Sequence, residues 1–226
     1  MRSIATNFDK EAETWDDDPA KVHRARAVAE AIRARVPLGP STRLLEYGAG
    51  TGLVSQALAE HVGLMTLAEP SVGMRAMIVD KIGANVLPST AQIWNLDLTT
   101  GEAPGERFDL IVTVMTLHHI RDLAPVLDGF VTLLREGGSL CVVDLDKEDG
   151  SFHKRDSAFD GHHGFERAAL AGQLEAAGFT GVRFEDCYEM EKEGSTYPLF
   201  LASCTTADLR AHRRSESATR NDTPAR

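Results

Sequence analysis

Short apolar runs recur along the chain, and each is followed by a helix-like or turn-rich stretch. Such alternation of short buried strands with helical segments is typical of a parallel sheet covered by helices. The hydrophobic pattern therefore predicts an α/β domain. The runs occupy residues 44–46, 65–68, 92–96, 110–115 and 139–143.

Three segments carry the apolar spacing and the end signals of helices. The first follows Asp18, which can cap it, and has Pro19 at its first position, where proline is favoured. In the second, residues 123–134, apolar side chains recur at helical intervals, and the glycine pair 137–138 is expected to close the helix. The third spans residues 165–177. These segments are the predicted covers of the sheet.

The end of the chain differs from this alternating pattern. The last apolar stretches, residues 182–184 and 199–203, have no helix pattern between them and are expected to pair as antiparallel strands. Residues 207–226 are rich in Arg, Ser, Thr and Ala without apolar periodicity, which predicts a disordered tail. We therefore expect one domain over residues 1–206, in which residues 1–39 form N-terminal helices.

The composition is that of one domain of ordinary size. With 226 residues, of which 42% are hydrophobic, the chain can bury one sizeable core. Its apolar runs fall far short of the roughly 20 residues that a membrane span needs, and its first residues lack the apolar core of a signal peptide. Cys141, Cys187 and Cys204 form no C-x-x-C pair of the kind that binds zinc or exchanges disulfides. We expect a soluble, cytoplasmic protein with reduced thiols and no membrane contact.

The charge distribution argues against nucleic acid as a partner of the folded domain. The formal net charge is −10, and residues 207–226 carry five Arg against three acidic residues, which leaves −12 for the rest of the chain. An acidic body repels phosphate backbones. A small-molecule substrate is therefore favoured, although a local basic groove is compatible with this net charge.

Residues 43–53 join an apolar run to three glycines at alternate positions, Gly48, Gly50 and Gly52. A buried strand that ends in a glycine-rich turn and enters a helix presents bare backbone N–H groups to a ligand. A dinucleotide turn, G-x-G-x-x-G, would need glycine at position 53, where the chain has Leu53. A P-loop would need a lysine directly after Gly52. NAD and nucleoside triphosphates are therefore disfavoured as ligands.

The pattern Glu46-x-Gly48-x-Gly50-Thr51-Gly52 resembles the first motif of class I S-adenosylmethionine (SAM) dependent methyltransferases. Further matches follow in the order expected for that family. The resemblance implies a Rossmann-like, mostly parallel sheet of seven strands in the order 3-2-1-4-5-7-6, with strand 7 antiparallel and helices on both faces. It also implies SAM as the cofactor and S-adenosylhomocysteine as the product.

Several residues match the cofactor contacts of this family. Glu69 stands where the family carries an acidic residue that accepts hydrogen bonds from both ribose hydroxyls, and a charged acceptor suits that role. Ser71 resembles the cap of the next helix, and Met74 the residue that packs near the adenine. Asp97 matches the carboxylate that accepts from the adenine amino group, and Met115 lies at the strand end near the methionine ammonium. The implied cofactor contacts are Glu46, Gly48, Ala49, Gly50, Gly52, Glu69, Pro70, Met74, Asp97, Leu98 and Met115.

SAM carries its own electrophile, so a protein of this family needs mainly to align and desolvate the reacting pair. Alignment contributes about 7 to 11 kcal/mol, whereas a positioned base adds about 10² to 10⁴-fold in rate, so a base is optional. Histidines at the substrate-facing ends of strands are the candidates. His119 and His163 are the hypothetical bases, and a role in packing or capping is the alternative for each. The other histidines in these two connections are His118, His153 and His162.

The run Asp144-x-Asp146-Lys147-Glu148-Asp149 contains closely spaced carboxylates of the kind that bind magnesium or calcium. Metal-dependent catechol-type O-methyltransferases, however, place an acidic residue near the end of strand four. Residues 113–116 are Thr-Val-Met-Thr in this chain. We therefore expect no metal.

The N-terminal segment Phe8-Asp9-x-x-Ala12-x-x-Trp15-Asp16 resembles the mobile entry helix of small-molecule methyltransferases, including ubiquinone-pathway enzymes. Phe8 and Trp15 are seven positions apart, so one helical face would carry both. The resemblance implies that an aromatic side chain closes over cofactor and substrate. An ordinary amphipathic helix packed on the sheet is the alternative.

The sequence therefore predicts an enzyme that moves a methyl group from SAM to an O, N, S or C nucleophile of a small molecule. Three alternatives stay open: a methyltransferase that acts on protein or RNA, a noncatalytic SAM-binding protein, and an NAD-dependent oxidoreductase of related fold. The identity of the substrate and the oligomeric state are not predicted.

Overall fold

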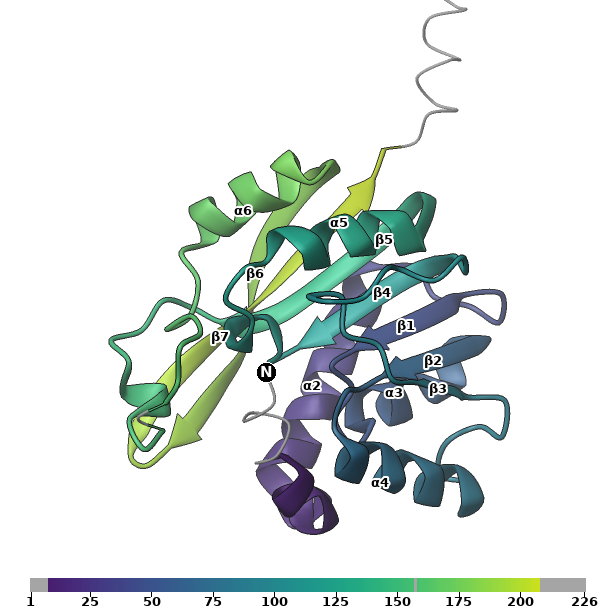
Figure 1. Cartoon of the computed structure of the whole chain (residues 1–226), viewed down its shortest axis with the longest axis horizontal. Helices are drawn as coiled ribbons and strands as arrows, with labels where there is room; N and C mark the ends of the chain where they lie inside the picture. The colour runs from purple at the N-terminus through teal and green to yellow at the C-terminus, as the bar shows by residue number, and fades with distance from the viewer. Residues whose placement is uncertain (1–7, 157, 208–226) are drawn as a thin grey trace, which may run out of the picture.

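A seven-stranded sheet forms the centre of the computed structural model, which describes residues 8–156 and 158–207 (Figure 1). The strand order is β3-β2-β1-β4-β5-β7-β6. The first five strands in this order pair in parallel, whereas β7 is antiparallel to both β5 and β6. The predicted Rossmann-like architecture is therefore confirmed. The strands are β1 (Arg43–Tyr47), β2 (Leu64–Ala68), β3 (Gln92–Trp94), β4 (Phe108–Val114), β5 (Leu134–Leu145), β6 (Phe179–Lys192) and β7 (Ser195–Thr206).

Helices cover both faces of the sheet, with α2, α3 and α4 on one face and α5 and α6 on the other (Figure 1). Asp18 caps α2 as predicted, because its Oδ1 accepts from the N–H of Ala20 at 2.9 Å. None of the helices in the described part of the chain has the length and apolarity that crossing a bilayer requires. The α-helices are α2 (Pro19–Arg35), α3 (Leu53–Leu58), α4 (Val72–Gly83), α5 (Ala124–Leu133) and α6 (Arg167–Ala176), and the 3₁₀ helices are η1 (Ala12–Asp17), η2 (Ala59–His61), η3 (Leu117–His119) and η4 (Ser151–His153).

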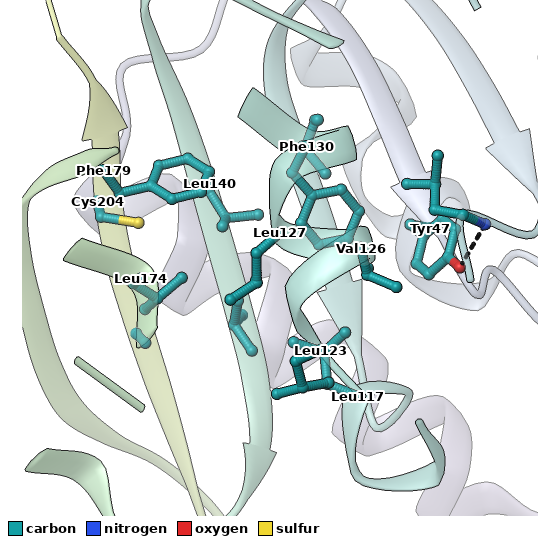
Figure 2. Packing of buried hydrophobic residues seen from close by; sticks show 14 of the residues in the cluster. Tyr47, Leu117, Leu123, Val126, Leu127, Phe130, Leu140, Leu174, Phe179 and Cys204 are labelled. Carbon is teal, nitrogen blue, oxygen red and sulfur yellow. Dashed lines mark hydrogen bonds between the residues drawn. The ribbon is translucent and has the colours of Figure 1, made fainter. Parts of the chain in front are cut away.

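The core under α5 fixes the end of β1, where the glycine turn begins (Figure 2). Phe130 of α5 is fully buried, and its ring meets Tyr47 edge-on with centroids 5.2 Å apart. The hydroxyl of Tyr47 accepts a hydrogen bond from the N–H of Leu98 at 3.2 Å. Edge-to-face aromatic pairs of this kind stabilise a core beyond the area that they bury. Tyr47, the last residue of β1, is therefore held by both packing and a hydrogen bond.

The glycine pair 137–138 does not close α5, so this part of the sequence prediction is wrong. α5 ends at Leu133, and Leu134 already belongs to β5, where it pairs with Phe108 of β4. The register then shifts so that Leu110 pairs with Ser139. Residues 135–138 therefore form an irregularity within β5, for which the positive φ of Gly137, 72°, is suited. These glycines became part of β5 because Leu134 pairs with β4, which lies earlier in the chain.

The final two strands form a long hairpin, which confirms the predicted antiparallel pair. β6 and β7 pair from Phe179↔Thr206 to Lys192↔Ser195. The connecting residues Glu193 and Gly194 have φ angles of 53° and 80°, and two successive positive φ angles match the right-handed twist of a tight hairpin. The tail predicted to be disordered lies outside the described residues apart from Ala207.

Candidate functional site

The glycine-rich turn follows directly on β1 and leads into α3. Gly48, Gly50 and Gly52 adopt positive φ angles of 72°, 56° and 79°. Glycine enters this left-handed region without the steric penalty that a Cβ imposes on other residues. The N–H groups of Gly48 and Ala49 donate to the carbonyl of Ala68, the last residue of β2, at 2.9 and 3.1 Å. The turn is therefore fixed to the carboxyl ends of two neighbouring strands.

The three glycines differ in what a side chain would meet. A Cβ at Gly48 would lie 2.3 Å from Oγ1 of Thr116, and a Cβ at Gly52 would lie 2.7 Å from a methyl carbon of Leu67. At Gly50, no described atom beyond the glycine and its two neighbours in the chain lies within 4 Å of the Cβ position. Packing within the protein therefore requires glycine at positions 48 and 52. The space beside Gly50, in contrast, is not filled by side chains of the described residues.

Glu69 connects the glycine turn to the start of α4. It is 6% exposed, and its two carboxylate oxygens accept hydrogen bonds from the N–H groups of Gly50 and Ser71, both at 2.8 Å. Burial raises the pKa of Glu69, against the opposing effect of these hydrogen bonds. Each carboxylate oxygen carries two lone pairs, so both oxygens can also accept from ligand hydroxyls. The structure thus brings together two predicted cofactor contacts, Glu69 and Gly50.

Glu46 lies beneath the turn rather than at its surface. It is 3% exposed, and its Oε2 accepts from the N–H of Ser55 in α3 at 2.9 Å. Burial raises the pKa of Glu46 to about 7, while the hydrogen bonds from Ser55 lower it. Glu46 therefore holds the start of α3 against the end of β1. Its direct contact with a cofactor stays a prediction.

Because of Glu46, the free energy of unfolding is expected to contain a component that falls as pH rises. A carboxyl whose pKa is raised on folding binds more protons in the folded state than in the unfolded state between the two pKa values. For Glu46 that window extends from 4.5 to about 7, with a slope of up to about 1.4 kcal/mol per pH unit. Urea denaturation of the wild type and of Glu46→Gln at several pH values measures it. As pH rises from 4.5 to about 7, the free energy of unfolding of the variant should increase relative to that of the wild type. A difference that stays constant with pH would contradict the raised pKa of Glu46.

Asp97 and Leu98, which follow β3, are engaged by the protein itself. Oδ1 of Asp97 accepts from the N–H and the hydroxyl of Thr99 at 2.9 and 2.6 Å, so this carboxylate stabilises its own turn. Leu98 is 3% exposed within the core, and its N–H donates to Tyr47. The predicted contact of Asp97 with adenine and the predicted cofactor contact of Leu98 stay predictions, and for Leu98 the observed role is packing.

The start of α4 and the end of β4 supply the remaining predicted contacts. Ser71 caps α4 as predicted, because its Oγ accepts from the N–H of Met74 at 3.2 Å. Met74 is 1% exposed, whereas Pro70 is exposed. Met115, directly after β4, has a φ of 52°, and its N–H donates to the carbonyl of Val143 at 2.8 Å. Non-glycine residues in this region of backbone space cluster at functional sites.

The N-terminal segment packs across the same edge of the sheet. Oδ1 of Asp9 accepts from the hydroxyl of Ser71 at 2.5 Å. Asp16 accepts from the hydroxyl of Thr51 at 2.6 Å and pairs with Lys81 of α4, also at 2.6 Å. The segment is thereby bonded to the glycine turn on one side and to α4 on the other.

Aromatic contacts extend this segment towards the histidines after β4. The rings of Phe8 and Trp15 meet edge-on with centroids 5.8 Å apart, so the two side chains lie on the same side of the segment. Phe8 also meets the ring of His119, at 5.6 Å between centroids. The N-terminal segment therefore spans from the glycine turn to η3.

His118 and His119 of η3 have different surroundings. His118 is 1% exposed, and its Nδ1 lies 2.6 Å from Oδ1 of the fully buried Asp144 in β5. The ring of His119 lies 4.1 Å from that of His118 and 5.2 Å from that of His153, between centroids. Burial, followed by the neighbouring His118 and His153, lowers the pKa of His119 to about 2. His119 is therefore neutral near pH 7.

His163, the other predicted base, lies in a different environment. Its side chain is 46% exposed, and its Nδ1 is 3.4 Å from Oε1 of Glu148. The ring of Phe159 contacts both predicted bases, at 5.8 Å from His119 and 5.5 Å from His163 between centroids. No ring contact joins the two histidines directly within the described ranges. Their catalytic roles stay predictions.

The carboxylates at the end of β5 and after it have separate partners. Asp144 faces His118, whereas Asp146 forms a two-bond pair with Arg167 at 2.7 and 2.6 Å. Glu148 accepts from N–H groups of its own loop. Magnesium and calcium need several oxygen ligands directed at one point. The arrangement of these carboxylates does not provide such a cage.

The fold and the glycine turn together define the class of protein. A seven-stranded sheet with one antiparallel strand, a glycine turn after β1 and an acidic residue after β2 is the architecture of class I SAM-dependent methyltransferases. The chain belongs to this family, because the model of the methyltransferase domain family matches residues 21–183.

Two individual proteins of known name are similar to this chain in sequence. The biotin biosynthesis bifunctional protein BioCD of Bordetella avium is 32% identical over 151 residues, which cover 65% of this chain and 31% of that protein. The ubiquinone biosynthesis O-methyltransferase of Xanthomonas campestris is 28% identical over 145 residues, which cover 61% of this chain and 58% of that protein. The chain thus spans less than two thirds of the length of either relative.

A solved structure shows the same fold. It is that of phosphoethanolamine N-methyltransferase 2 from Haemonchus contortus, in complex with phosphomonomethylethanolamine and S-adenosylhomocysteine. The TM-score is 0.67 at 14% sequence identity, over 79% of this chain and 52% of that one. The similarity at this identity concerns the fold alone.

Sequence reasoning missed the pairing of His118 with Asp144 and the position of His153. One signal was available for the pair. Asp144 interrupts the apolar run of β5, and a carboxylate inside a buried strand requires a polar partner. No comparable signal marks His153, because it lies in an irregular connection whose path the sequence does not determine.

Proposed function

We propose that this protein is a SAM-dependent methyltransferase that transfers a methyl group to an oxygen, nitrogen, sulfur or carbon nucleophile of a small molecule. The observation that carries the proposal is the geometry at Gly50, whose N–H is held by Glu69 and whose Cβ position is open. A cofactor approaching there meets bare backbone and a buried carboxylate. Open α/β sheets bind ligands at this edge, beyond the carboxyl ends of their strands.

In this proposal, the chain's own residues bind and orient the cofactor. The turn at residues 48–52 cradles the methionine part, Glu69 accepts from the ribose hydroxyls, and Asp97 accepts from the adenine amino group. Met115 lies near the methionine end. The bound cofactor supplies a methyl group activated by a sulfonium. Alignment of this methyl group with a nucleophile, in a site from which water is excluded, lowers the barrier by about 7 to 11 kcal/mol.

A general base is not needed for this mechanism, and the surroundings of the two predicted bases give it little support. The pKa of about 2 makes His119 a weak base near neutral pH, where an effective base has a pKa close to the working pH. His163 is about half exposed and lies next to Glu148. Alignment is therefore the main contribution of the protein.

A small molecule is the substrate class that the observations favour. In this proposal the N-terminal segment, which is bonded to the glycine turn and to α4, covers the cofactor site and limits access by large substrates. The formal net charge of −10 opposes the approach of RNA. The name of one similar protein, a ubiquinone biosynthesis O-methyltransferase, points to a substrate of the same class.

Methyl transfer from labelled SAM tests the proposal. The purified protein is incubated with methyl-labelled SAM and, separately, with small-molecule, protein and RNA fractions of a cell extract. We expect label in the small-molecule fraction together with an equal amount of S-adenosylhomocysteine. Label in protein or RNA would contradict the substrate class. SAM binding without any transfer would indicate a noncatalytic SAM-binding protein.

Deletion of residues 1–17 is expected to weaken SAM binding by about two- to tenfold. The hydrogen bond from Thr51 to Asp16 joins this segment to the cofactor turn, and one such bond contributes about 0.5 to 1.5 kcal/mol. Isothermal titration calorimetry with SAM on the full chain and on the shortened chain measures the difference. Glu13→Ala, at an exposed position of the same segment, is the matched control and should bind as the wild type does. Equal affinities of the full and shortened chains would contradict a lid.

A further inference from the structure

Three histidines gather at the end of β4, next to the candidate cofactor site. His118 and His119 belong to η3, and His153 belongs to η4 in the connection after β5. One ring nitrogen of each histidine lies within 4.8 Å of a ring nitrogen of each of the others. Across residues 8–156 and 158–207, no other group of three or more His, Cys, Asp or Glu meets this distance.

Ring nitrogens of all three histidines are buried without a hydrogen-bond partner among the described residues. They are Nε2 of His118, Nδ1 of His119 and Nε2 of His153. A buried polar atom without a partner lowers stability by about 1 to 3 kcal/mol, so native proteins rarely keep several in one place. A ligand that accepts the lone pairs of these nitrogens would satisfy all three at once.

Asp144 holds His118 in the orientation that metal ligation requires. Its Oδ1 lies 2.6 Å from Nδ1 of His118, and its Oδ2 accepts from the backbone N–H of His118 at 3.2 Å. Metal-bound histidines commonly donate their second ring N–H to a carboxylate, which fixes both the tautomer and the ring orientation. With the proton on Nδ1, the lone pair of His118 is on Nε2, the atom that has no partner in the described part of the chain.

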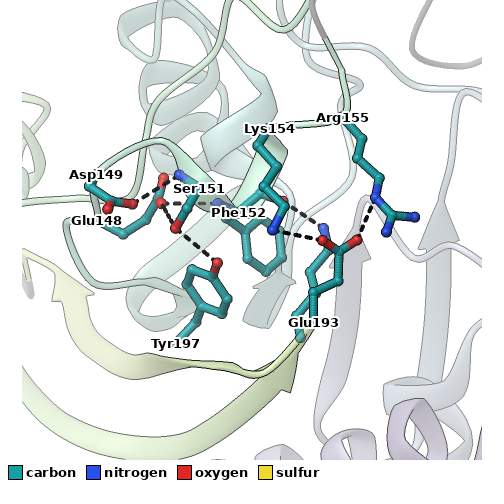
Figure 3. Close-up of polar contacts among 9 residues, drawn as sticks. Glu148, Asp149, Ser151, Phe152, Lys154, Arg155, Glu193 and Tyr197 are labelled. Carbon is teal, nitrogen blue, oxygen red and sulfur yellow. Dashed lines mark hydrogen bonds and ion pairs between the residues drawn. The ribbon is translucent and has the colours of Figure 1, made fainter.

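The loop that supplies His153 is fixed to the β6–β7 hairpin (Figure 3). Oγ of Ser151 lies 2.9 Å from the hydroxyl of Tyr197, and Nζ of Lys154 pairs with Glu193 at 2.9 Å. Ser151 lies two positions before His153, and Lys154 follows it directly. The backbone that carries His153 is therefore held on both sides by contacts of its neighbours.

We propose that His118, His119 and His153 bind a divalent transition metal, and that Zn²⁺ fits the site best. Imidazole ligands suit Zn²⁺, and three histidines with an open fourth position form one type of catalytic zinc site. Nitrogens at about 2.0 to 2.1 Å from zinc in a tetrahedron lie about 3.4 Å apart. The observed ring nitrogens lie within 4.8 Å of one another, so metal binding would require them to approach by up to about 1.4 Å. The proposal departs from the sequence-based expectation of no metal, which considered the carboxylates of residues 144–149 and the lack of an acidic residue at positions 113–116 but not the histidines.

The metal site also narrows the substrate class, and this step rests on the proposed function. His119 contacts Phe8, so the site adjoins the N-terminal segment that is bonded to the glycine turn. Bound Zn²⁺ lowers the pKa of a coordinated hydroxyl or thiol, whose proton then leaves to solvent. The oxygen or sulfur forms a bond to the methyl carbon while the bond from that carbon to the sulfonium breaks, and the electron pair goes to sulfur. The substrate is therefore an alcohol, a phenol or a thiol.

Zinc binding by the full chain tests the site. The protein is purified without a histidine tag, stripped of metal with a chelator and titrated with ZnCl₂ in a calorimeter. We expect one Zn²⁺ per chain, and Co²⁺ in its place should give the visible absorption of tetrahedral cobalt. His153→Ala should weaken zinc binding by about tenfold or more, and Asp144→Asn by about 10- to 100-fold. His61→Ala, before β2 at the opposite edge of the sheet, is the control and should bind as the wild type does.

Any other result of these zinc, SAM and methyl-transfer measurements would contradict one part of the proposal. Circular dichroism checks that the variants are folded, and His153, which is only partly buried, provides the variant that depends least on folding. Absence of zinc binding by the folded wild type, or equal binding by His153→Ala, would overturn the metal site. SAM binding is measured on the same preparations, so zinc binding without SAM binding would remove only the proposed function. Transfer to an amine in place of a hydroxyl or thiol would overturn the substrate class.

Discussion

Replacement of Gly48 by alanine is expected to lower the free energy of unfolding by about 2 to 5 kcal/mol. Two effects combine at this position. A non-glycine residue at a φ of 72° costs about 1 to 2 kcal/mol. The new Cβ would also lie 2.3 Å from Oγ1 and 2.4 Å from Cγ2 of Thr116, and overpacking of this kind costs about 1 to 3 kcal/mol. Urea denaturation measures the change.

Gly50→Ala is the matched control for this prediction. Its φ of 56° gives a similar backbone cost, but no described atom beyond residue 50 and its two neighbours in the chain lies within 4 Å of the new Cβ. The variant should lose only about 1 to 2 kcal/mol of stability, yet it should bind SAM less tightly because its Cβ occupies the space in front of the turn. Thr116→Gly should restore part of the stability lost in Gly48→Ala. Equal losses in the two alanine variants would contradict the assigned contacts.

Replacement of Glu69 by alanine is expected to weaken SAM binding by about 10- to 150-fold. Hydrogen bonds to a charged group contribute about 1.5 to 3 kcal/mol, and Glu69 is placed to accept them from the ribose. The variant also loses the contact from the N–H of Gly50, which loosens the turn. Calorimetric titration with SAM measures the affinity of the wild type and the variant.

Two further variants separate the loss of the ribose hydrogen bonds from the loosening of the glycine turn. Glu69→Gln keeps one oxygen that can accept from Gly50 but loses the charge, so its affinity should lie between those of the wild type and Glu69→Ala. Glu60→Ala removes an exposed carboxylate from η2 and should leave SAM affinity unchanged. Unaltered affinity in Glu69→Ala would mean that the ribose binds elsewhere.

The fold was largely predictable because its signals are local. Asp18 and Pro19 mark the start of α2 within two residues, and the strands are short apolar runs separated by helices. The glycine pair 137–138 shows where such signals fail. Two glycines after an apolar helix read as a helix end, but pairing of Leu134 with the distant Phe108 made them part of β5.

The candidate site was predictable only in part. Gly50 and Glu69 belong to motifs whose order along the chain is informative, and the structure brings the two together. The contacts of His118 with Asp144 and with His153 join residues that lie far apart in sequence. The contact with Asp144 depends on the parallel pairing of β4 with β5. The contact with His153 depends on the path of an irregular loop after β5, and no periodicity or spacing in the sequence encodes that path. Burial of the ring nitrogens, which motivates the metal site, can be recognised only in three dimensions.

Ligand-dependent thermal stability tests the central claim, that the glycine turn holds SAM. The full chain is heated with SAM, S-adenosylhomocysteine, NAD, NADP or ATP. A ligand at about 100 times its dissociation constant adds about 2.7 kcal/mol of stability, which for a chain of this size raises the Tm by about 5 to 11 °C. The account predicts such a rise with SAM and with S-adenosylhomocysteine, and none with NAD, NADP or ATP. A rise with NAD and none with SAM would contradict it.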